Sequence, residues 1–503
     1  MSIVDVNTHQ VRRYGHWIEG AETATDQFID RVSPESGAIV AQFAKGTDEE
    51  AKQAVESAKL AFEAGPWPRL SSTQRATLLN KWADAIEAET EMLIRIEVEE
   101  SGKIYRVAKG DIEGSISLIR YAAALAVQMH GQAFTQFGGE LNAMVVHEPV
   151  GVVGAIVPWN FPTIIFAQKV PFALAAGCTV VVKPSELTSG SAVELARLAS
   201  QVGIPAAVLN VVTGLGDPVG KHLVNSPDVD MISFTGSTAT GLHVLQGQLV
   251  NFKRVSLELG GKSAAIVLDD CDLEAAVDGV MFSIFLHQGQ VCCAGSRLLV
   301  QDTIADVFLK RLLERISALN FGPLMDSQTD IGPLVSDVQL SSVQKFISRA
   351  REQGAEVLCG GNKADSSDRY AKYPGAARTV LPTVLDNVKQ EMAIFDEEAF
   401  GPVLAVTRFR SEDEAVRLAN ASKYGLAGSV WSKDFNKAFA IASAVRTGTI
   451  EINTSLEGQP QLPFGGYKTS GIGREKGLDG LMEFTETKTI GFRSTPRKPF
   501  FAG

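Results

Sequence analysis

The feature that most constrains the fold is an alternation of short apolar segments with helix-like segments between residues 152 and 238. The apolar segments are typical of strands buried on both faces, and the segments between them have helical spacing. This order predicts a parallel sheet with crossover helices, which is an α/β fold. The predicted strands are 152–157, 179–182, 209–212 and 231–234, and the predicted helices are 166–176 and 191–202.

The length of 503 residues indicates two or three domains rather than one. A second stretch of α/β character runs from about residue 263 to 447. Residues 48–64 and 72–98 have the three- and four-residue spacing of amphipathic helices. The C-terminal segment has the pattern of a loop followed by a strand, and a terminal strand of that kind often pairs with another subunit.

Charge, hydropathy and cysteine content argue against several classes of protein. The net charge of −11 disfavours nucleic acids and anionic membranes as main partners. The N-terminus has no apolar core of signal-peptide length, and the most apolar region, 151–182, is interrupted by prolines and polar residues. The five cysteines have no zinc-ligand spacing, so we expect free thiols, a cytoplasmic location and no metal site.

Two of the five cysteines, Cys292 and Cys293, are adjacent. Adjacent residues rarely reach the geometry of a disulfide. The pair lies in a small, flexible segment from Gly289 to Gly295, which suits a thiolate held against a ligand. We therefore interpret one thiol as reactive and the other as a packing neighbour. The remaining three are expected to be buried and inert: Cys178, Cys271 and Cys359.

Glycine-rich turns follow two of the predicted strands. The turn from Gly214 to Gly220 is one residue longer than the usual dinucleotide fingerprint, so a plain tight turn remains an alternative. The turn with Gly236 and Ser237 has small residues that let the backbone approach a pyrophosphate. Because open α/β sheets bind ligands at the carboxyl ends of their strands, the two turns together favour a nucleotide site.

Two further residues suit chemistry at such a site. Glu258 lies within an apolar, glycine-rich run, where desolvation disfavours the charged form and moves a carboxyl toward general-base behaviour near neutral pH. A surface acid beside Lys262 is the alternative. Asn160 lies in a turn after a strand, where its amide suits a developing oxyanion or simply fixes the turn.

Taken together, these segments belong to a series of seven motifs, which cover most of the chain from about residue 15 to 490. The motifs are PWNFP at 158–162, KPSE at 183–186, FTGST at 234–238, LELGGKS at 257–263, GQVCCAGSR at 289–297, EEAFGPV at 397–403 and PFGGYKTSGIGRE at 463–475. In these motifs and their order the chain resembles the aldehyde dehydrogenase superfamily, whose NAD(P)-dependent enzymes oxidise aldehydes to carboxylic acids.

The resemblance implies three catalytic residues. Cys292 matches the nucleophile, which is the cysteine two places after the glutamine of the GQ dipeptide. Glu258 matches the general base. Asn160 matches the oxyanion donor, assisted by the backbone N–H of Cys292. The reaction implied is attack on the aldehyde, hydride transfer to the nicotinamide, and hydrolysis of a cysteine thioester by water that Glu258 activates.

The resemblance also implies NAD as cofactor, with NADP as the second candidate. Glu186 favours NAD because a carboxylate at that position repels a 2′-phosphate. Lys183 and Glu186 match the adenosine-ribose contacts, and Glu398 and Phe400 match the nicotinamide-ribose contacts. The full set of expected cofactor residues is Trp159, Lys183, Ser185, Glu186, Gly216, Phe234, Gly236, Ser237, Gly260, Glu398 and Phe400.

The expected substrate tunnel is mostly apolar and has no arginine to pair a substrate carboxylate, so we expect neutral aliphatic or aromatic aldehydes rather than semialdehydes. Glu457 in the 453–463 loop resembles betaine-aldehyde dehydrogenases, although their tryptophan is missing, so an aminoaldehyde is an alternative. His287 stands where many members carry Asn. The expected tunnel residues are Phe161, Ile164, Ile165, Gln168, Leu286, Val291, Cys293, Leu456 and Phe464.

The fold implied has a Rossmann-like cofactor domain, a second α/β catalytic domain and a small β oligomerisation arm that gives a homodimer or homotetramer. The cofactor domain is expected at 1–125 and 149–258, the catalytic domain at 259–447, a return segment at 448–475, and the arm at 126–148 and 476–503.

Three other functions compete with oxidation to a free acid. A CoA-acylating dehydrogenase commonly lacks the base that Glu258 supplies. A catalytically silent binding protein of the same fold does not require the intact set of Cys292, Glu258 and Asn160. A thiol hydrolase that uses Cys292 with His287 needs no nucleotide cofactor, so this alternative does not explain the glycine-rich turns.

Overall fold

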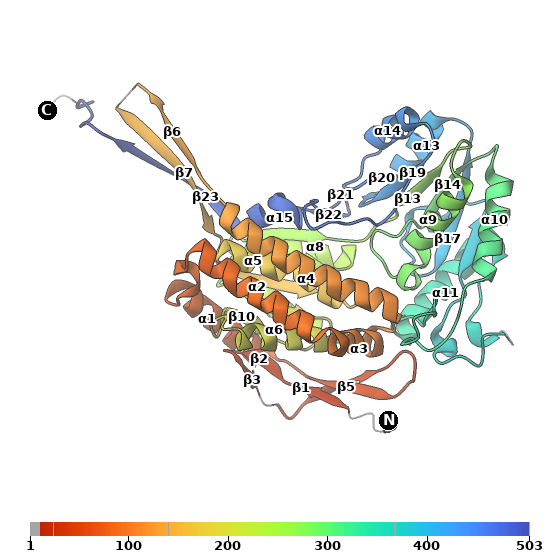
Figure 1. Ribbon diagram of the computed structural model, residues 1–503, viewed down its shortest axis with the longest axis horizontal. Helices are drawn as coiled ribbons and strands as arrows, with labels where there is room; N and C mark the ends of the chain where they lie inside the picture. The colour runs from red at the N-terminus through yellow and green to blue at the C-terminus, as the bar shows by residue number, and fades with distance from the viewer. Residues whose placement is uncertain (1–10, 24, 139, 367–368, 502–503) are drawn as a thin grey trace.

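The computed structural model describes residues 11–501 apart from residues 24, 139, 367 and 368. It consists of two α/β units and a narrow sheet that projects from them (Figure 1). The predicted α/β fold with two α/β units is therefore confirmed.

The first unit is built on an eight-stranded sheet. Its five central strands are parallel, and antiparallel strands close both edges. In order across the sheet the strands are β22 (Gly471–Ile472), β12 (Arg254–Glu258), β11 (Met231–Thr235), β8 (Val152–Val157), β9 (Thr179–Pro184), β10 (Leu209–Val211), β2 (His16–Ile18) and β3 (Ala21–Thr23). Its helices are α1 (Asp48–Glu63), α2 (Ser72–Ala88), α3 (Thr90–Ser101), α4 (Tyr105–Gln128), α5 (Pro162–Ala176), α6 (Gly190–Gln201), α7 (Lys221–Asn225) and α8 (Thr238–Gln246).

The second unit is built on a seven-stranded sheet that is parallel except at one edge. In order its strands are β15 (Glu356–Cys359), β16 (Thr383–Asp386), β17 (Val403–Phe409), β14 (Arg297–Gln301), β13 (Ala264–Val267), β19 (Gly428–Trp431) and β20 (Glu451–Ile452). Its helices are α9 (Leu273–Phe285), α10 (Ala305–Ser317), α11 (Asp337–Glu352), α12 (Ala393–Asp396), α13 (Glu412–Asn420) and α14 (Phe435–Ala444).

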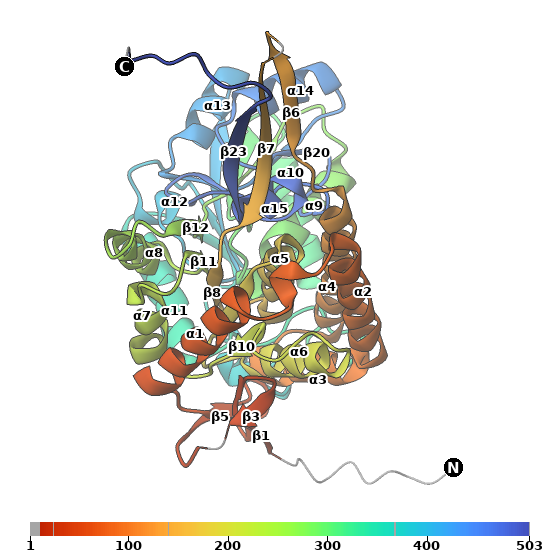
Figure 2. The ribbon, with the colours of Figure 1, turned by 90° about the vertical axis from the view of Figure 1, so that its left-hand side faces the viewer.

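The projecting sheet has three antiparallel strands. They are β6 (Gln132–Phe137), β7 (Leu141–Pro149) and β23 (Thr485–Arg493), in the order β23-β7-β6. Figure 2 shows this sheet at the opposite end of the molecule from the small N-terminal sheet of β1 (Arg12–Tyr14), β5 (Ile39–Ala44) and β4 (Phe28–Val32). Residues 126–128, predicted as the start of the arm, belong to α4, and a short helix α15 (Gly477–Glu483) precedes β23. A further two-stranded sheet pairs β18 (Tyr424–Gly425) with β21 (Tyr467–Lys468).

The predicted elements agree with the first sheet in position, with two differences. The helix predicted from residue 166 begins at Pro162, because proline has no N–H to lose in the first helical turn. The single helix predicted over 72–98 is wrong. The chain leaves helical geometry at Glu89, with φ −106° and ψ 19°, and a new helix begins at Thr90. The Thr90 hydroxyl donates to the Glu87 carbonyl at 2.8 Å, which gives that carbonyl a partner at the break.

The order of the parallel strands creates a ligand crevice. From β8 the chain proceeds to β9 and β10 on one side, and then returns to place β11 and β12 on the other side. The connections that leave the carboxyl ends of β8 and β11 therefore run in opposite directions. This is a topological switch point, where open α/β sheets bind their ligands. The turn after β8 carries Asn160, and the turn after β11 carries Gly236.

The C-terminal segment returns from the second unit to the first. Strand β22 pairs antiparallel with β12, which places Gly471 opposite Glu258. Because of this return, Glu258 lies between neighbouring strands on both sides. Across the described part of the chain, no helix combines the length and the apolar character needed to cross a membrane.

Candidate active site

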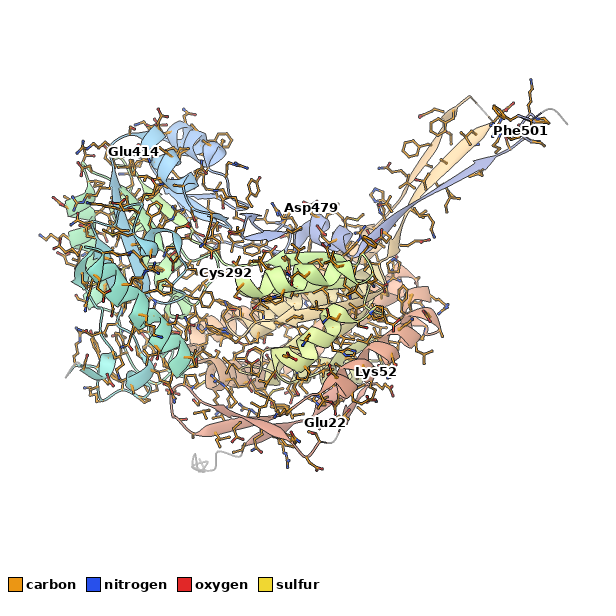
Figure 3. The ribbon with its side chains drawn as sticks, turned by 180° about the vertical axis from the view of Figure 1, so that it is seen from behind. Glu22, Lys52, Cys292, Glu414, Asp479 and Phe501 are labelled. Atoms are coloured by element: carbon orange, nitrogen blue, oxygen red, sulfur yellow. The ribbon has the colours of Figure 1, made fainter. Side chains whose placement is uncertain are left out.

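A cavity of about 270 Å³ lies at the carboxyl ends of β8, β11 and β12. Residues of both α/β units line it, and Figure 3 shows Cys292 where the two units face each other. Nine of the predicted site residues meet there: Asn160, Trp159, Gly236, Ser237, Glu258, Gly260, Cys292, Glu398 and Phe400.

Cys292 lies in an irregular loop between α9 and β14, where the residue is half-buried. A hydrogen bond with the Cys293 thiol raises the pKa of Cys292, and burial and the carboxyls of Glu398 and Glu258 raise it further. The same hydrogen bond lowers the pKa of Cys293. The Cys292 backbone carbonyl packs so closely on Gly261 that a Cβ there would lie 2.3 Å from the carbonyl oxygen. The nucleophile loop is thus fixed by a contact that only glycine permits.

Asn160 is buried after β8, and its side-chain amide donates to the Gln290 carbonyl at 2.9 Å. Gln290 in turn accepts from the Val335 N–H through its own side chain at 3.0 Å. One N–H of the Asn160 amide therefore orients the group, and the second N–H, which donates to no residue that the structure describes, is available for a substrate oxygen. This is the arrangement an oxyanion donor requires.

Glu258 ends β12 and is 3% exposed. Burial raises its pKa well above the ordinary value, and the nearby Glu475 carboxylate raises it further, whereas Lys169 and Arg474 lower it. Neither of its carboxyl oxygens has a hydrogen-bond partner among the described residues. Gly465 packs directly on the carboxyl group, where a Cβ would lie 2.7 Å from Oε1. A desolvated carboxyl with unused oxygens is suited to activating water.

Lys169 and Glu475 form a buried ion pair beside Glu258. Lys169 also donates to the Ser233 hydroxyl at 3.1 Å. Glu475 is held by its backbone as well, because its N–H and carbonyl pair with Phe464 at 2.7 Å each. The sequence motifs contained Glu475 but gave no reason to connect it with Lys169 in α5.

Glycines give the cavity a wall that a flat ligand can approach. A Cβ at Gly236 would lie 2.5 Å from the ring of Phe234, and a Cβ at Gly260 would lie 2.2 Å from a carboxylate oxygen of Glu398. Ser237 caps α8, because its hydroxyl accepts from the Thr240 N–H at 3.2 Å. The N-terminal N–H groups of that helix therefore begin at the cavity edge, where helices bind phosphate.

The opposite wall comes from the second unit. Glu398 accepts from the Gly261 N–H at 3.1 Å, and burial raises the pKa of Glu398 to about 7. Phe400 meets Trp159 edge to face, with ring centroids 5.3 Å apart. The two units therefore touch across the cavity through an aromatic pair, one ring from each.

The other predicted cofactor residues lie outside this cavity, near the ends of adjacent strands. Lys183 at the end of β9 is 4% exposed, and its Nζ is 3.4 Å from the half-buried Glu186 carboxylate. The Ser185 hydroxyl accepts from the Leu187 N–H. Gly216 is exposed after β10, and a Cβ there would meet nothing within 4 Å. Close packing gives no reason for glycine at residue 216.

The predicted tunnel residues are distributed around the cavity rather than gathered in it. Phe161, Ile164, Ile165 and Gln168 occupy the start of α5, and Val291 and Cys293 flank Cys292. Leu286 and Leu456 line a separate cavity of about 690 Å³. Two arginines at that second cavity, Arg106 and Arg315, are paired with aspartates.

His287 is buried behind Phe161, with ring centroids 5.3 Å apart. Burial and the charge of Lys103 lower its pKa well below the ordinary value, so the ring is neutral. No hydrogen bond joins it to Cys292 among the described residues. This position does not suit the general base of a thiol hydrolase.

The three other cysteines have thiols with raised pKa values. Burial raises the pKa of Cys178 to about 12 and the pKa values of Cys271 and Cys359 to about 11. These thiols are protonated and unreactive near neutral pH. In the described ranges, no group of three or more His, Cys, Asp or Glu side chains has an arrangement that could hold a metal ion.

Sequence reasoning also missed Lys476, which follows the last motif. It is 6% exposed, and its Nζ lies 5.5 Å from the centre of the Phe464 ring. The sequence carried no signal for it, because a lysine after a charged motif is ordinarily exposed.

Comparison with known proteins agrees with this geometry. The family model of the aldehyde dehydrogenase family matches residues 17–490 of the chain. The chain is 41% identical to the NADP/NAD-dependent aldehyde dehydrogenase PuuC of Escherichia coli, covering 95% of this chain and 94% of that protein. It is 38% identical to the betaine aldehyde dehydrogenase of Bacillus subtilis, covering 96% of each. The crystal structure of an NAD-dependent aldehyde dehydrogenase from Sinorhizobium meliloti superposes with a TM-score of 0.95 at 41% identity, over 99% of each chain.

Proposed function

The chain belongs to the aldehyde dehydrogenase family, and we propose from that premise that it oxidises an aldehyde to a carboxylic acid with NAD, using the residues of the cavity. NAD supplies the hydride acceptor when it is bound. The other steps fall to side chains of the chain itself.

Cys292 is the proposed nucleophile. Its raised pKa means that the thiol needs a base, and the deprotonated Glu258 carboxylate in the same cavity is the base available. The sulfur forms a bond to the aldehyde carbon, and the carbonyl electrons move to the oxygen. The free N–H of the Asn160 amide and the backbone N–H of Cys292 stabilise that oxyanion.

Glu258 has a second role after the hydride has left the substrate carbon. The acyl group is then a thioester on Cys292. Glu258 first releases the proton it took from the thiol to solvent, and as a carboxylate it takes a proton from water while the water oxygen attacks the acyl carbon. The carbon–sulfur bond breaks, the acid is released, and Cys292 leaves as a thiolate that the proton on Glu258 can neutralise. The raised pKa of Glu258 makes its carboxylate a stronger base than that of an exposed glutamate. Because the carboxyl must be deprotonated to act, turnover should increase as the pH rises through this raised pKa.

The cavity walls fit the proposed cofactor. Gly236 and Gly260 leave room that any side chain would remove, and the buried Glu398 suits ribose hydroxyls. The Glu186 carboxylate favours NAD over NADP by repelling a 2′-phosphate. Lys183, Ser185, Gly216 and Phe234 are proposed as the adenosine side of the same site.

The observation that carries this function is the single cavity holding Cys292, Glu258 and Asn160. We would measure NADH formation with NAD or NADP over a panel of aldehydes, for wild type, Cys292→Ala and Cys293→Ala. We expect NADH with wild type, loss with Cys292→Ala, and altered aldehyde preference with Cys293→Ala. Full turnover by Cys292→Ala would overturn the assignment of the nucleophile.

Assembly and location are part of the same proposal. The β6–β7–β23 sheet projects from the body with both edge strands open and with apolar side chains such as Phe137, Ile490 and Phe492 exposed. Such edges pair readily with another chain, so we propose a homodimer or homotetramer, to be tested by light scattering. Five free thiols support a reducing, cytoplasmic location.

A further inference from the structure

Lys476 is a mostly buried lysine that forms no ion pair with any residue the structure describes. The residue is 6% exposed, and its ammonium makes no hydrogen bond to another described residue. Its Nζ lies 5.5 Å from the Phe464 ring centre, and a Cβ on Gly458 would be 3.4 Å from the same atom. The ammonium is therefore held between the Phe464 side chain and the 453–463 loop.

Two of the nearby carboxylates already have other donors, and the third, Glu258, forms no ion pair with Lys476 although it acts on it electrostatically. Glu451 accepts from the backbone N–H groups of Leu456 at 2.6 Å and Glu457 at 2.8 Å. Glu475 is paired with Lys169. A largely desolvated ammonium that forms no ion pair would gain from a further anion at this place.

Lys476 is near enough to the reaction centre to interact with its charged groups. Burial lowers the pKa of Lys476, and the negative groups that oppose this effect are first Cys293, then Glu475, Glu258 and Glu451. Cys293 is the neighbour of the nucleophile, and Phe464 is a predicted tunnel residue. Because Lys476 lies against the ring of a predicted tunnel residue, we expect its ammonium beside the path of the substrate to Cys292.

We propose that Lys476 binds an anionic group at the far end of the substrate, so that the protein prefers aldehydes with a terminal carboxylate to neutral aldehydes of equal length. This inference rests on the proposed dehydrogenase function and narrows its substrate class. It reverses the expectation of neutral aldehydes, which considered only arginine as a carboxylate partner. It also disfavours cationic aldehydes, because like charges repel at a buried site.

The test compares substrates matched in length. The ratio of kcat/KM for succinic semialdehyde over butanal, and for glutaric semialdehyde over pentanal, would be measured in wild type, Lys476→Met and Lys476→Arg, with betaine aldehyde as the cationic probe. Lys253→Met is the matched control, because Lys253 is 3% exposed but donates to the Ser226 carbonyl in the first unit.

We expect wild type to favour the carboxylated member of at least one pair. Lys476→Met should lower that preference by about tenfold to a hundredfold, the value of one charge-assisted hydrogen bond. Lys476→Arg should keep most of the preference, and Lys253→Met should keep all of it. A wild-type preference for butanal, pentanal or betaine aldehyde, or an unchanged ratio in Lys476→Met, would overturn the role of Lys476 while leaving the dehydrogenase intact. Absence of NADH with every aldehyde would instead defeat the proposed function itself.

Discussion

Replacing Glu475 by glutamine should lower the pKa of the general base. Burial is the largest cause of the raised pKa of Glu258, Glu475 is the second, and Lys169 acts in the opposite direction. In Glu475→Gln the negative charge is gone while the Lys169 ammonium stays. The Gln amide oxygen still accepts from Lys169, and the backbone pairing with Phe464 does not depend on the side chain.

The direction of the effect follows from these opposing charges. A nearby carboxylate raises the pKa of a carboxyl, and a nearby ammonium lowers it. Removing the Glu475 charge while keeping Lys169 should therefore lower the pKa of Glu258, and each pH unit by which the midpoint moves corresponds to about 1.4 kcal/mol. The pKa stays above that of an exposed glutamate, because the carboxyl remains buried.

The assay is the pH dependence of kcat with saturating NAD and aldehyde, under conditions where a burst of NADH shows that thioester hydrolysis limits turnover. We expect the acid-side midpoint to move to lower pH in Glu475→Gln. Glu483→Gln is the control, because Glu483 has the smallest of the effects named on Glu258 and should move the midpoint less, in the same direction. A midpoint that stays in place or rises in Glu475→Gln would refute this account of the base.

Three other substitutions test separate parts of the structure. Asn160→Ala should reduce kcat/KM by about a hundredfold to a thousandfold, because an oxyanion donor is lost, and steady-state kinetics will show it. Gly236→Ala should raise KM for NAD in steady-state kinetics, because the added Cβ meets the Phe234 ring. An unchanged KM for NAD would contradict the role of Gly236 in the cofactor site. Lys103→Met should lower the free energy of unfolding by about 3–5 kcal/mol in urea titrations near pH 8, because it leaves the Asp111 carboxylate buried and unpaired. In that variant Asp111 has a raised pKa when folded, so the loss should shrink as the pH falls.

The local parts of the site could be predicted from the sequence. Glycine-rich turns at the ends of apolar strands indicated a ligand crevice, and Asn160, Gly236 and Glu258 do lie around one cavity. This succeeded because residues after parallel strands of one sheet meet at one edge, wherever they occur along the chain. The break at Glu89 was missed because the apolar periodicity continues from α2 into α3 without a proline or glycine.

The contacts made by the C-terminal segment could not be predicted in the same way. Lys169 and Glu475 are separated by 306 positions, and no local pattern relates them. Lys476 looked like one more charged residue after a motif. Its burial depends on the return of its segment to the first unit and on the 453–463 loop that covers it, which only the three-dimensional structure reveals.

The pairing of β22 with β12 has a consequence for the order in which the enzyme becomes active during its synthesis. Domains fold from the N-terminal end as the chain leaves the ribosome. Strand β12 is made early, but its free edge and Glu258 are covered only when Gly471 and Ile472 arrive. In a nascent chain that already contains Asn160, Glu258 and Cys292 we therefore expect Glu258 to remain exposed to water. We expect the desolvated base to form only after residues 471–472 have been added, close to the end of translation.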